Sequence, residues 1–163
     1  MKRLWLAVLL FLPIFVHPQT TEEVMKWIKD YWKRNGVSCG MMFNAGLAEG
    51  YNNALQFHYA GFKKVYPFAK DQWADPCQSW TNKYRGHDPQ NGEAYPFSTS
   101  ALVWTTDAWH FTKFQRDMYL GCAVAFKIGG GKQKWFWYLF DIAVYSVFMD
   151  VGFNISYTLL NQK

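Results

Sequence analysis

One stretch of the sequence places residue types that could do acid–base or metal chemistry close together. It runs from Thr105 to Phe111, and in it Asp107 precedes His110 by three residues. On a helix, Asp107, His110 and Asp117 fall within one narrow arc. A carboxylate at this spacing can orient the imidazole or share a metal with it. Asp107 and His110 are therefore the candidate catalytic residues, and Asp107, His110 and Asp117 are the candidate ligands of a metal that the sequence does not identify.

This acid–histidine pair also has a purely structural interpretation, which we favour. A single Asp-x-x-His pattern is common, and its hydrogen bond often does no more than fix a contact between helices. Glu49, His58, Asp141 or Asp150 could complete a site if their helices turn these side chains inward. No serine stands in a nucleophile motif, so acyl-transfer chemistry has no support.

The composition is that of a folded, aromatic-rich protein with a basic balance. Half of the 163 residues are hydrophobic and a fifth are aromatic, which excludes a disordered chain. The formal net charge is +5, from 17 Lys and Arg against 12 Asp and Glu. No basic-aromatic module of a nucleic-acid-binding protein accompanies this charge. We therefore expect no nucleic-acid partner and regard anionic lipid as the more natural one.

Residues 1–19 have the layout of an export signal. Two basic residues precede an apolar run at 4–16, which is the length of a secretory signal and short for a spanning helix. Cleavage just before Gln19 or Thr20 is the expectation, and an uncleaved anchor is the alternative. In an oxidising compartment Cys39 and Cys77 could pair, and three buried thiols are the equally weighted alternative.

Residues 20–163 are predicted to form one all-α domain of about four helices. Thr20 and Glu23 have capping-box spacing, and an apolar stripe then predicts an amphipathic helix that ends at Asn35-Gly36. That helix could lie on lipid headgroups or dock on the domain, and we favour docking. A second helix over about 40–59 carries small residues four apart, which lets another helix come close. These small residues are Gly46, Gly50 and Ala54.

The second half of the domain is predicted to be a long loop followed by a helical hairpin. Prolines and glycines over 63–100 break every regular pattern. We expect this loop to pack on the domain through its rings, which are Trp73, Trp80, Tyr84 and Tyr95. A third helix over 98–128, capped by Ser98, Thr99 or Ser100, and a fourth over 135–160 then form a membrane-associated C-terminal hairpin.

The hairpin decides whether the chain enters a membrane. Residues 135–160 are long enough to cross, but Asp141 and Asp150 each cost about 2.5–3.5 kcal/mol on insertion scales. About a dozen large apolar residues roughly offset that cost. Basic residues at the start of the signal and around the turn favour a cytoplasmic turn, with residues 20–98 on the outer, periplasmic side. These residues are Lys2, Arg3, Lys127, Lys132 and Lys134. A soluble exported bundle is the alternative.

Three blocks of the middle region carry a family resemblance. They are Ser79-Trp80-Thr81-Asn82-Lys83-Tyr84, then Gly86 with Asp88-Pro89 and Gly92-Glu93, then Thr106-Asp107-Ala108-Trp109-His110. Over roughly residues 54–126 the chain resembles a group of uncharacterised small membrane proteins encoded in bacterial and phage genomes. The resemblance implies membrane association and no particular activity. Such relatives are more apolar after the histidine, and Lys113, Arg116 and Asp117 depart from that pattern here, which counts against a full span. A shorter likeness, of 107–111 alone, is to the Asp-x-x-His-Phe element of VanZ-like membrane proteins.

These observations predict an exported, membrane-associated protein of the cell envelope. Its expected role is that of a non-catalytic component that acts through contacts with the lipid bilayer and with other envelope proteins. The alternative is a small membrane-surface hydrolase that uses Asp107 and His110, with or without a metal. No motif identifies a substrate or a cofactor.

Overall fold

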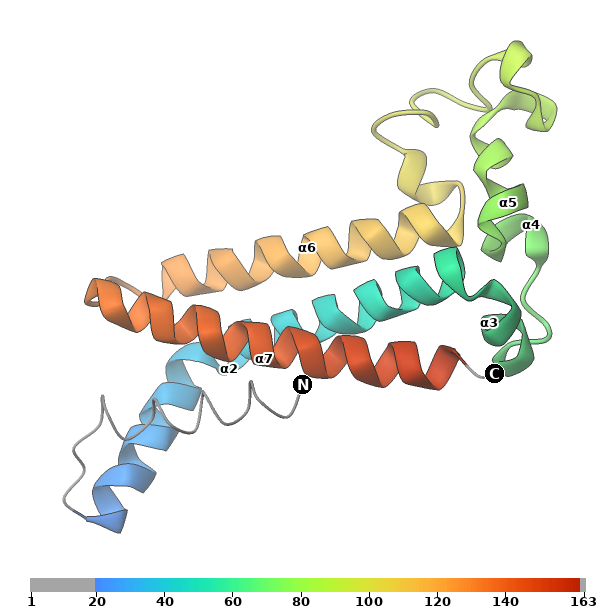
Figure 1. The fold of residues 1–163 in the computed structure, drawn as a ribbon. Coiled ribbons are helices and arrows are strands. Elements are labelled where there is room, and N and C mark those ends of the chain that lie inside the picture. The colour runs from blue at the N-terminus through green and yellow to red at the C-terminus, as the bar shows by residue number, and fades with distance from the viewer. Residues whose placement is uncertain (1–19, 162–163) are drawn as a thin grey trace.

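The computed structural model describes residues 20–161 and places three long helices side by side (Figure 1). They are α2 (Thr21–Phe57), α6 (Ala108–Gly129) and α7 (Trp135–Leu160). α2 contacts both of the others, running antiparallel to α6 and parallel to α7. The described residues contain helices and turns but no named β-strand, which confirms the predicted all-α class. The predicted export signal lies outside the described residues.

α2 is one uninterrupted helix of 37 residues. It begins with the predicted capping box, in which the Thr20 hydroxyl and the Glu23 carboxylate each accept a hydrogen bond from the backbone N–H of the other residue. The predicted helix end at Asn35-Gly36 is wrong. Asn35 is 1 % exposed, and its side-chain amide donates to the Tyr31 carbonyl one turn back, at 3.3 Å. Tertiary contacts thus hold a residue that often ends helices in the middle of one.

The first half of α2 is docked on α7 through aromatic side chains. The Trp27 and Tyr31 rings lie 6.0 and 5.5 Å from the ring of Phe140, measured between centroids. The basic residues of this segment are all exposed; they are Lys26, Lys29, Lys33 and Arg34. Docking, the favoured of the two interpretations of this amphipathic segment, is the one that these contacts support.

The second half of α2 meets α7 through glycines. A Cβ atom built on Gly46 would lie 2.0 Å from the Met149 carbonyl oxygen, and one on Gly50 would lie 2.5 Å from the Phe153 carbonyl oxygen. From the other side, a Cβ on Gly152 would lie 2.2 Å from the Phe43 carbonyl oxygen. The two backbones are therefore in direct contact, which confirms the close helix approach predicted from the spacing of the small residues.

The segment between α2 and α6 is a series of short helices at one end of the bundle (Figure 1). They are α3 (Tyr59–Val65), α4 (Asp71–Ala74), α5 (Pro76–Ser79), η1 (Trp80–Lys83), η2 (Arg85–His87), η3 (Pro89–Asn91) and η4 (Val103–Thr105). Asn82 ties the segment together, because its side-chain amide donates to the carbonyls of Gln72 and Thr106 at 2.7 and 2.8 Å.

The rings of this segment are less packed than predicted. Trp73, Trp80 and Tyr95 remain 41, 44 and 39 % exposed. The segment is ordered mainly by its own hydrogen bonds, such as the one from the Ser98 hydroxyl to the Lys83 carbonyl at 2.7 Å. The predicted packing of the loop on the domain through these rings is therefore only partly realised.

α6 begins ten residues later than predicted. Residues 98–107 form turns and η4, and Ser98, Thr99 and Ser100 cap no helix. Asp107 is the N-cap of α6 instead. α6 and α7 are antiparallel and joined by the predicted glycine-containing turn, but their main contacts are with α2 and not with each other. The predicted connection of α6 and α7 by a short turn is therefore correct, but the two helices are held together through their contacts with α2.

Cys39 and Cys77, which could have paired, form no disulfide. All three cysteines are free, with Cys39 fully buried in α2 and Cys77 exposed between the short helices. Cys122 is partly buried. Neither open alternative, one disulfide or three buried thiols, describes this arrangement.

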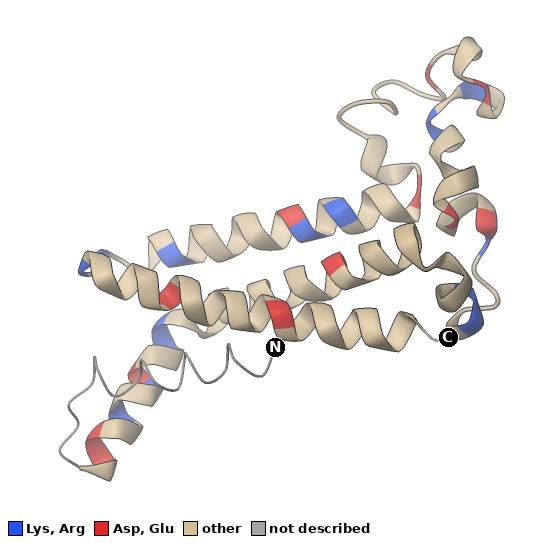
Figure 2. Cartoon of the chain, in the orientation of Figure 1, with Lys and Arg blue, Asp and Glu red and all other residues tan. Residues whose placement is uncertain are grey.

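α7 differs from the other long helices in its surface. Among the described residues, it is the one helix long and apolar enough to cross a membrane. Only 11 % of its most apolar stretch of 18 residues is buried. Its two charged residues, Asp141 and Asp150, interrupt an otherwise uncharged ribbon (Figure 2). α6, by contrast, carries charges along its length and does not qualify as a span.

Candidate functional site

Asp107 and His110 are brought together at the start of α6. The Asp107 side chain is 2 % exposed, and its Oδ1 accepts a hydrogen bond from the His110 backbone N–H at 2.8 Å. Its Oδ2 lies 2.6 Å from His110 Nδ1 and also accepts from the Thr106 hydroxyl at 3.0 Å. One carboxylate therefore both caps the helix and orients the imidazole.

His110 keeps part of its ring accessible. Its side chain is 21 % exposed, and its ring meets the edge of Trp109 at 4.7 Å between centroids. With Nδ1 held by a carboxylate, Nε2 is the nitrogen left to take or give a proton. The pair therefore has the geometry of an oriented acid–base group.

The other candidate residues do not join this pair. Asp117 is 56 % exposed and binds the Arg116 guanidinium at 2.8 Å. Glu49 binds the same guanidinium at 2.7 Å, and His58 Nε2 lies 2.6 Å from the Tyr157 hydroxyl. Within the described residues no group of three His, Cys, Asp or Glu side chains is placed to hold a metal ion. The three predicted ligands thus do not assemble: Asp117 binds Arg116, and it lies seven residues along α6, about 10 Å along the helix axis, from His110.

A second polar cluster, which sequence reasoning missed, lies where the three helices meet near the α6–α7 turn. Lys127 Nζ lies 2.5 Å from Asp141 Oδ2 and 2.8 Å from Asn35 Oδ1. Their side chains are well buried, with Lys127 14 % and Asp141 4 % exposed. The Gln133 amide donates to the same Asp141 oxygen at 2.6 Å, and the Tyr145 hydroxyl donates to Asn35 at 3.0 Å. Every long helix contributes to this Lys127–Asp141 cluster.

One signal could have revealed the cluster in advance. Asp141 stands two turns inside an apolar helix, where a carboxylate is costly unless it is paired. The preceding turn reverses the chain and brings the end of α6 next to the start of α7, so that Lys127 is the cation within reach. The sequence had instead suggested a topological role for Lys127 and an insertion cost for Asp141.

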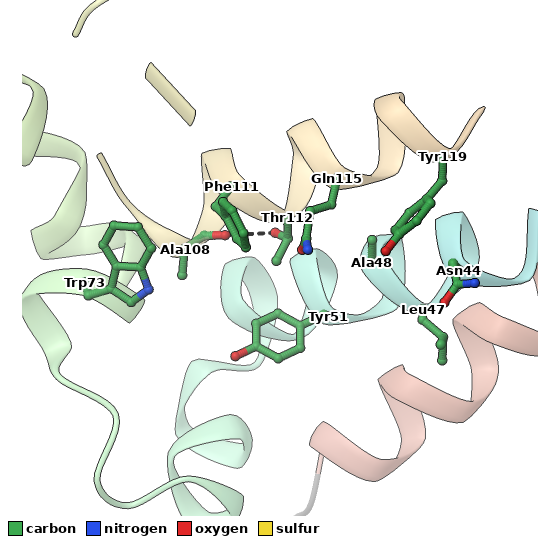
Figure 3. A pocket seen from close by; sticks show the side chains of 10 residues that line it. All are labelled: Asn44, Leu47, Ala48, Tyr51, Trp73, Ala108, Phe111, Thr112, Gln115 and Tyr119. Carbon is green, nitrogen blue, oxygen red and sulfur yellow. Dashed lines mark hydrogen bonds between the residues drawn. The ribbon is translucent and has the colours of Figure 1, made fainter. Parts of the chain in front are cut away.

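A cavity of about 440 Å³ lies along the groove between α2 and α6 (Figure 3). It is lined by Asn44, Leu47, Ala48, Tyr51, Trp73, Ala108, Phe111, Thr112, Gln115 and Tyr119. The lining is uncharged and mixes aromatic rings with amides and hydroxyls. Phe111 and Tyr119 descend from α6, Tyr51 comes from α2, and Trp73 of α4 stands at one end (Figure 3).

Comparisons of the chain with protein-family models, with curated proteins and with solved structures find no match. The resemblance to uncharacterised small membrane proteins therefore remains a prediction that rests on the residues of the middle region alone.

Proposed function

We propose that the chain is an exported, membrane-held component of the cell envelope that acts through contacts with lipid and with other proteins rather than by catalysis. The observation that carries the proposal is the exposed apolar surface of α7. Six large hydrophobic side chains of this helix are at least 37 % exposed: Trp135, Tyr138, Leu139, Ile142, Ile155 and Leu159. In water a helix of this composition would be expected to bury such side chains against a core.

Pairing of Asp141 supports insertion of α7. On insertion scales each unpaired Asp in the middle of a span costs about 2.5–3.5 kcal/mol. Asp141 is bound to Lys127 and Gln133 and shielded by the neighbouring helices, so that most of its cost falls away in the folded bundle. Asp150 is then the one acidic residue of α7 whose full insertion cost the apolar residues of the helix must offset.

The flanks of α7 support an orientation. Lys132 and Lys134 are exposed at the turn, immediately before the aromatic residues that open the helix. Basic turns stay on the cytoplasmic side, and Trp and Tyr favour the headgroup level. We therefore place the α6–α7 turn at the cytoplasmic surface and the short helices of residues 58–107 on the outer side. The start of α2 packs beside the start of α7, where Trp27 contacts Phe140, so this orientation puts it at the cytoplasmic end. The outer placement predicted for residues 20–98 is thus kept here only for the residues after α2.

Alkaline extraction of membranes from cells that express a C-terminally tagged chain tests this proposal. We expect the protein to stay in the membrane pellet, because α7 is held by apolar surface and not by charge. A double variant, Leu139→Glu with Ile142→Glu, should be released, since each exposed acid adds an insertion cost of about 3 kcal/mol. Lys132→Glu in the turn is the matched control and should remain in the pellet. Release of the wild-type chain would instead establish a soluble exported bundle.

A hydrolase at the membrane surface is the second candidate, favoured by the short contact between Asp107 and His110. In the structural interpretation, we expect Asp107→Ala to lower the free energy of unfolding by about 1–2 kcal/mol through loss of the N-cap, as measured by thermal unfolding. Asp117→Ala, an exposed acid of the same helix, should leave stability unchanged.

The His110→Ala variant separates the two functions. If the pair is structural, this variant keeps the fold and the wild-type protein neither cleaves a p-nitrophenyl ester nor holds a metal detectable by elemental analysis. If the folded variant loses such a cleavage or such a metal, the hydrolase is correct and the non-catalytic proposal fails.

A further inference from the structure

The side of α7 that faces away from α2 carries a stripe of small and polar side chains. We call it the Asp150 face; it consists of Ala143, Ser146, Asp150 and Asn154. Spacings of three and four residues place these on one side of the helix. Gly152, which touches α2, lies on the opposite side. Ala143, Ser146 and Asp150 are exposed, and Asn154 is half-buried.

The polar groups of the Asp150 face are satisfied locally, with one exception. The Ser146 hydroxyl donates to the Ile142 carbonyl at 2.9 Å, and the Asn154 amide donates to the Asp150 carbonyl at 2.6 Å. Such bonds to the preceding turn are the way small polar residues are accommodated in a membrane helix. The Asp150 carboxylate has no hydrogen-bond or ion-pair partner in the part of the chain that the structure describes.

The position of Asp150 makes this lack of a partner costly. α7 runs from Trp135 to Leu160, so Asp150 stands within one turn of its midpoint. If α7 crosses the bilayer, the carboxylate there faces hydrocarbon, where an acidic side chain is costly unless it is paired. Intramembrane acids are normally paired and mark functional contacts. Among the described residues, Asp141 follows that rule and Asp150 does not.

Among residues 20–161, the cations near this depth are engaged elsewhere. Gly46, which touches Met149 of α7, is one turn of α2 from Glu49, and Glu49 binds Arg116. Arg116 thus lies near the depth of Asp150, but Glu49 and Asp117 already occupy its guanidinium. Lys113, one turn before Arg116 on α6, lies 5.0 Å from the centroid of the Trp109 ring. In the described part of the chain, three carboxylates and two cations therefore lie near this level, and Asp150 is the carboxylate that no cation binds.

We propose that the Asp150 face is a docking surface for a partner's membrane-spanning helix that presents a lysine or arginine near its midpoint. Ala143 and Ser146, in the two turns before Asp150, let a second helix come close, and the carboxylate supplies the specific contact. A second copy of this chain fits less well, because a two-fold contact would place one Asp150 against the other. This inference rests on the proposed membrane function, in which α7 crosses the bilayer.

Association with model helices in phosphatidylcholine vesicles tests the proposal. The full chain, with Cys122→Ser so that Cys77 takes the fluorophore, is mixed with a labelled leucine–alanine spanning peptide that has one central lysine. A second peptide has leucine in place of the lysine. We expect energy transfer to report an association about fivefold to thirtyfold stronger for the lysine peptide, the range for a polar contact of about 1–2 kcal/mol between membrane helices.

Variants distinguish this contact from general attraction. Asp150→Leu should abolish the preference for the lysine peptide, and Asp150→Lys should transfer it to a peptide with a central aspartate. Asp117→Asn removes an exposed acid from α6 at nearly the same depth and should leave the preference intact. Equal association of the lysine and leucine peptides with the wild-type chain overturns the proposal.

Two further outcomes of the same samples also count against the proposal. Energy transfer between two differently labelled copies of the chain that Asp150→Leu abolishes assigns the face to a second copy. Release of the wild-type chain from the vesicles at alkaline pH overturns both this inference and the proposed membrane function. Retention without a preference for lysine overturns this inference alone.

Discussion

Gly46→Ala is expected to lower the free energy of unfolding by about 3 kcal/mol. The added methyl group would lie 2.0 Å from the Met149 carbonyl oxygen and 2.9 Å from the Phe153 backbone nitrogen. Backbone atoms of a packed helix cannot move aside as a side chain can, so that α7 must shift away from α2. The loss should exceed the roughly 1 kcal/mol that alanine gains over glycine in a helix interior. Thermal unfolding of the purified protein, followed by circular dichroism, measures it.

Gly40→Ala in the same helix is the matched control. A Cβ atom there meets nothing within 4 Å, so only the helix propensity changes. We expect this variant to be about 0.5–1 kcal/mol more stable than the wild type. Equal stability changes at Gly40 and Gly46 would contradict the close contact between α2 and α7.

Lys127→Met is expected to have the second large effect, a loss of about 3–5 kcal/mol. The substitution leaves the Asp141 carboxylate, 4 % exposed, without its cation and takes one hydrogen-bond donor from Asn35. A buried charge without a partner is far more destabilising than the loss of the pair as a whole. The midpoint of chemical denaturation measures the change.

The double variant Lys127→Met/Asp141→Leu should recover most of that loss, because no uncompensated charge remains. Lys63→Met is a control at a comparable but open ion pair, in which Lys63 and Asp71 are 34 and 46 % exposed. It should destabilise much less, although the Lys63 hydrogen bond lowers the pKa of Asp71. A double variant no more stable than Lys127→Met would show that the charges are not the reason for the loss.

The long helices could be predicted where the sequence carries hydrophobic periodicity or the residues typical of helix ends. α7 has the predicted bounds because an aromatic cluster opens it and a glycine turn precedes it. The capping box of Thr20 fixed the start of α2 for a similar reason, since its two hydrogen bonds are local. Local signals of this kind do not depend on the rest of the fold.

The errors occurred where distant contacts decide the structure. Asn35-Gly36 is a common helix end, but Asn35 accepts hydrogen bonds from Lys127 and Tyr145, which lie far away in the sequence. These hydrogen bonds offset the poor helix propensity of Asn35 and Gly36. At the start of α6 three hydroxyl residues offered equivalent caps, and Asp107 took the role because its carboxylate binds both the backbone and the ring of His110.

The candidate site was predictable only in part. The spacing of Asp107 and His110 was sufficient to bring them together, because both lie within one turn of α6. The predicted third ligand failed because Arg116 stands beside Asp117 and binds it. The Lys127–Asp141 cluster joins residues of all three long helices, and its geometry depends on the way α2 lies between the other two.

The contact between α2 and α7 has a consequence for the order of synthesis. Gly46 and Met149 touch although about a hundred residues of chain separate them. During translation the glycine surface of α2 and its rings at Trp27 and Tyr31 must stay uncovered until α7 has been made, whereas α6 can dock earlier. Such non-local pairing slows folding. The nascent chain therefore passes through a stage in which α2 and α6 are packed together while the α7-binding surface of α2 is exposed. Any helix that resembles α7 could bind to that surface.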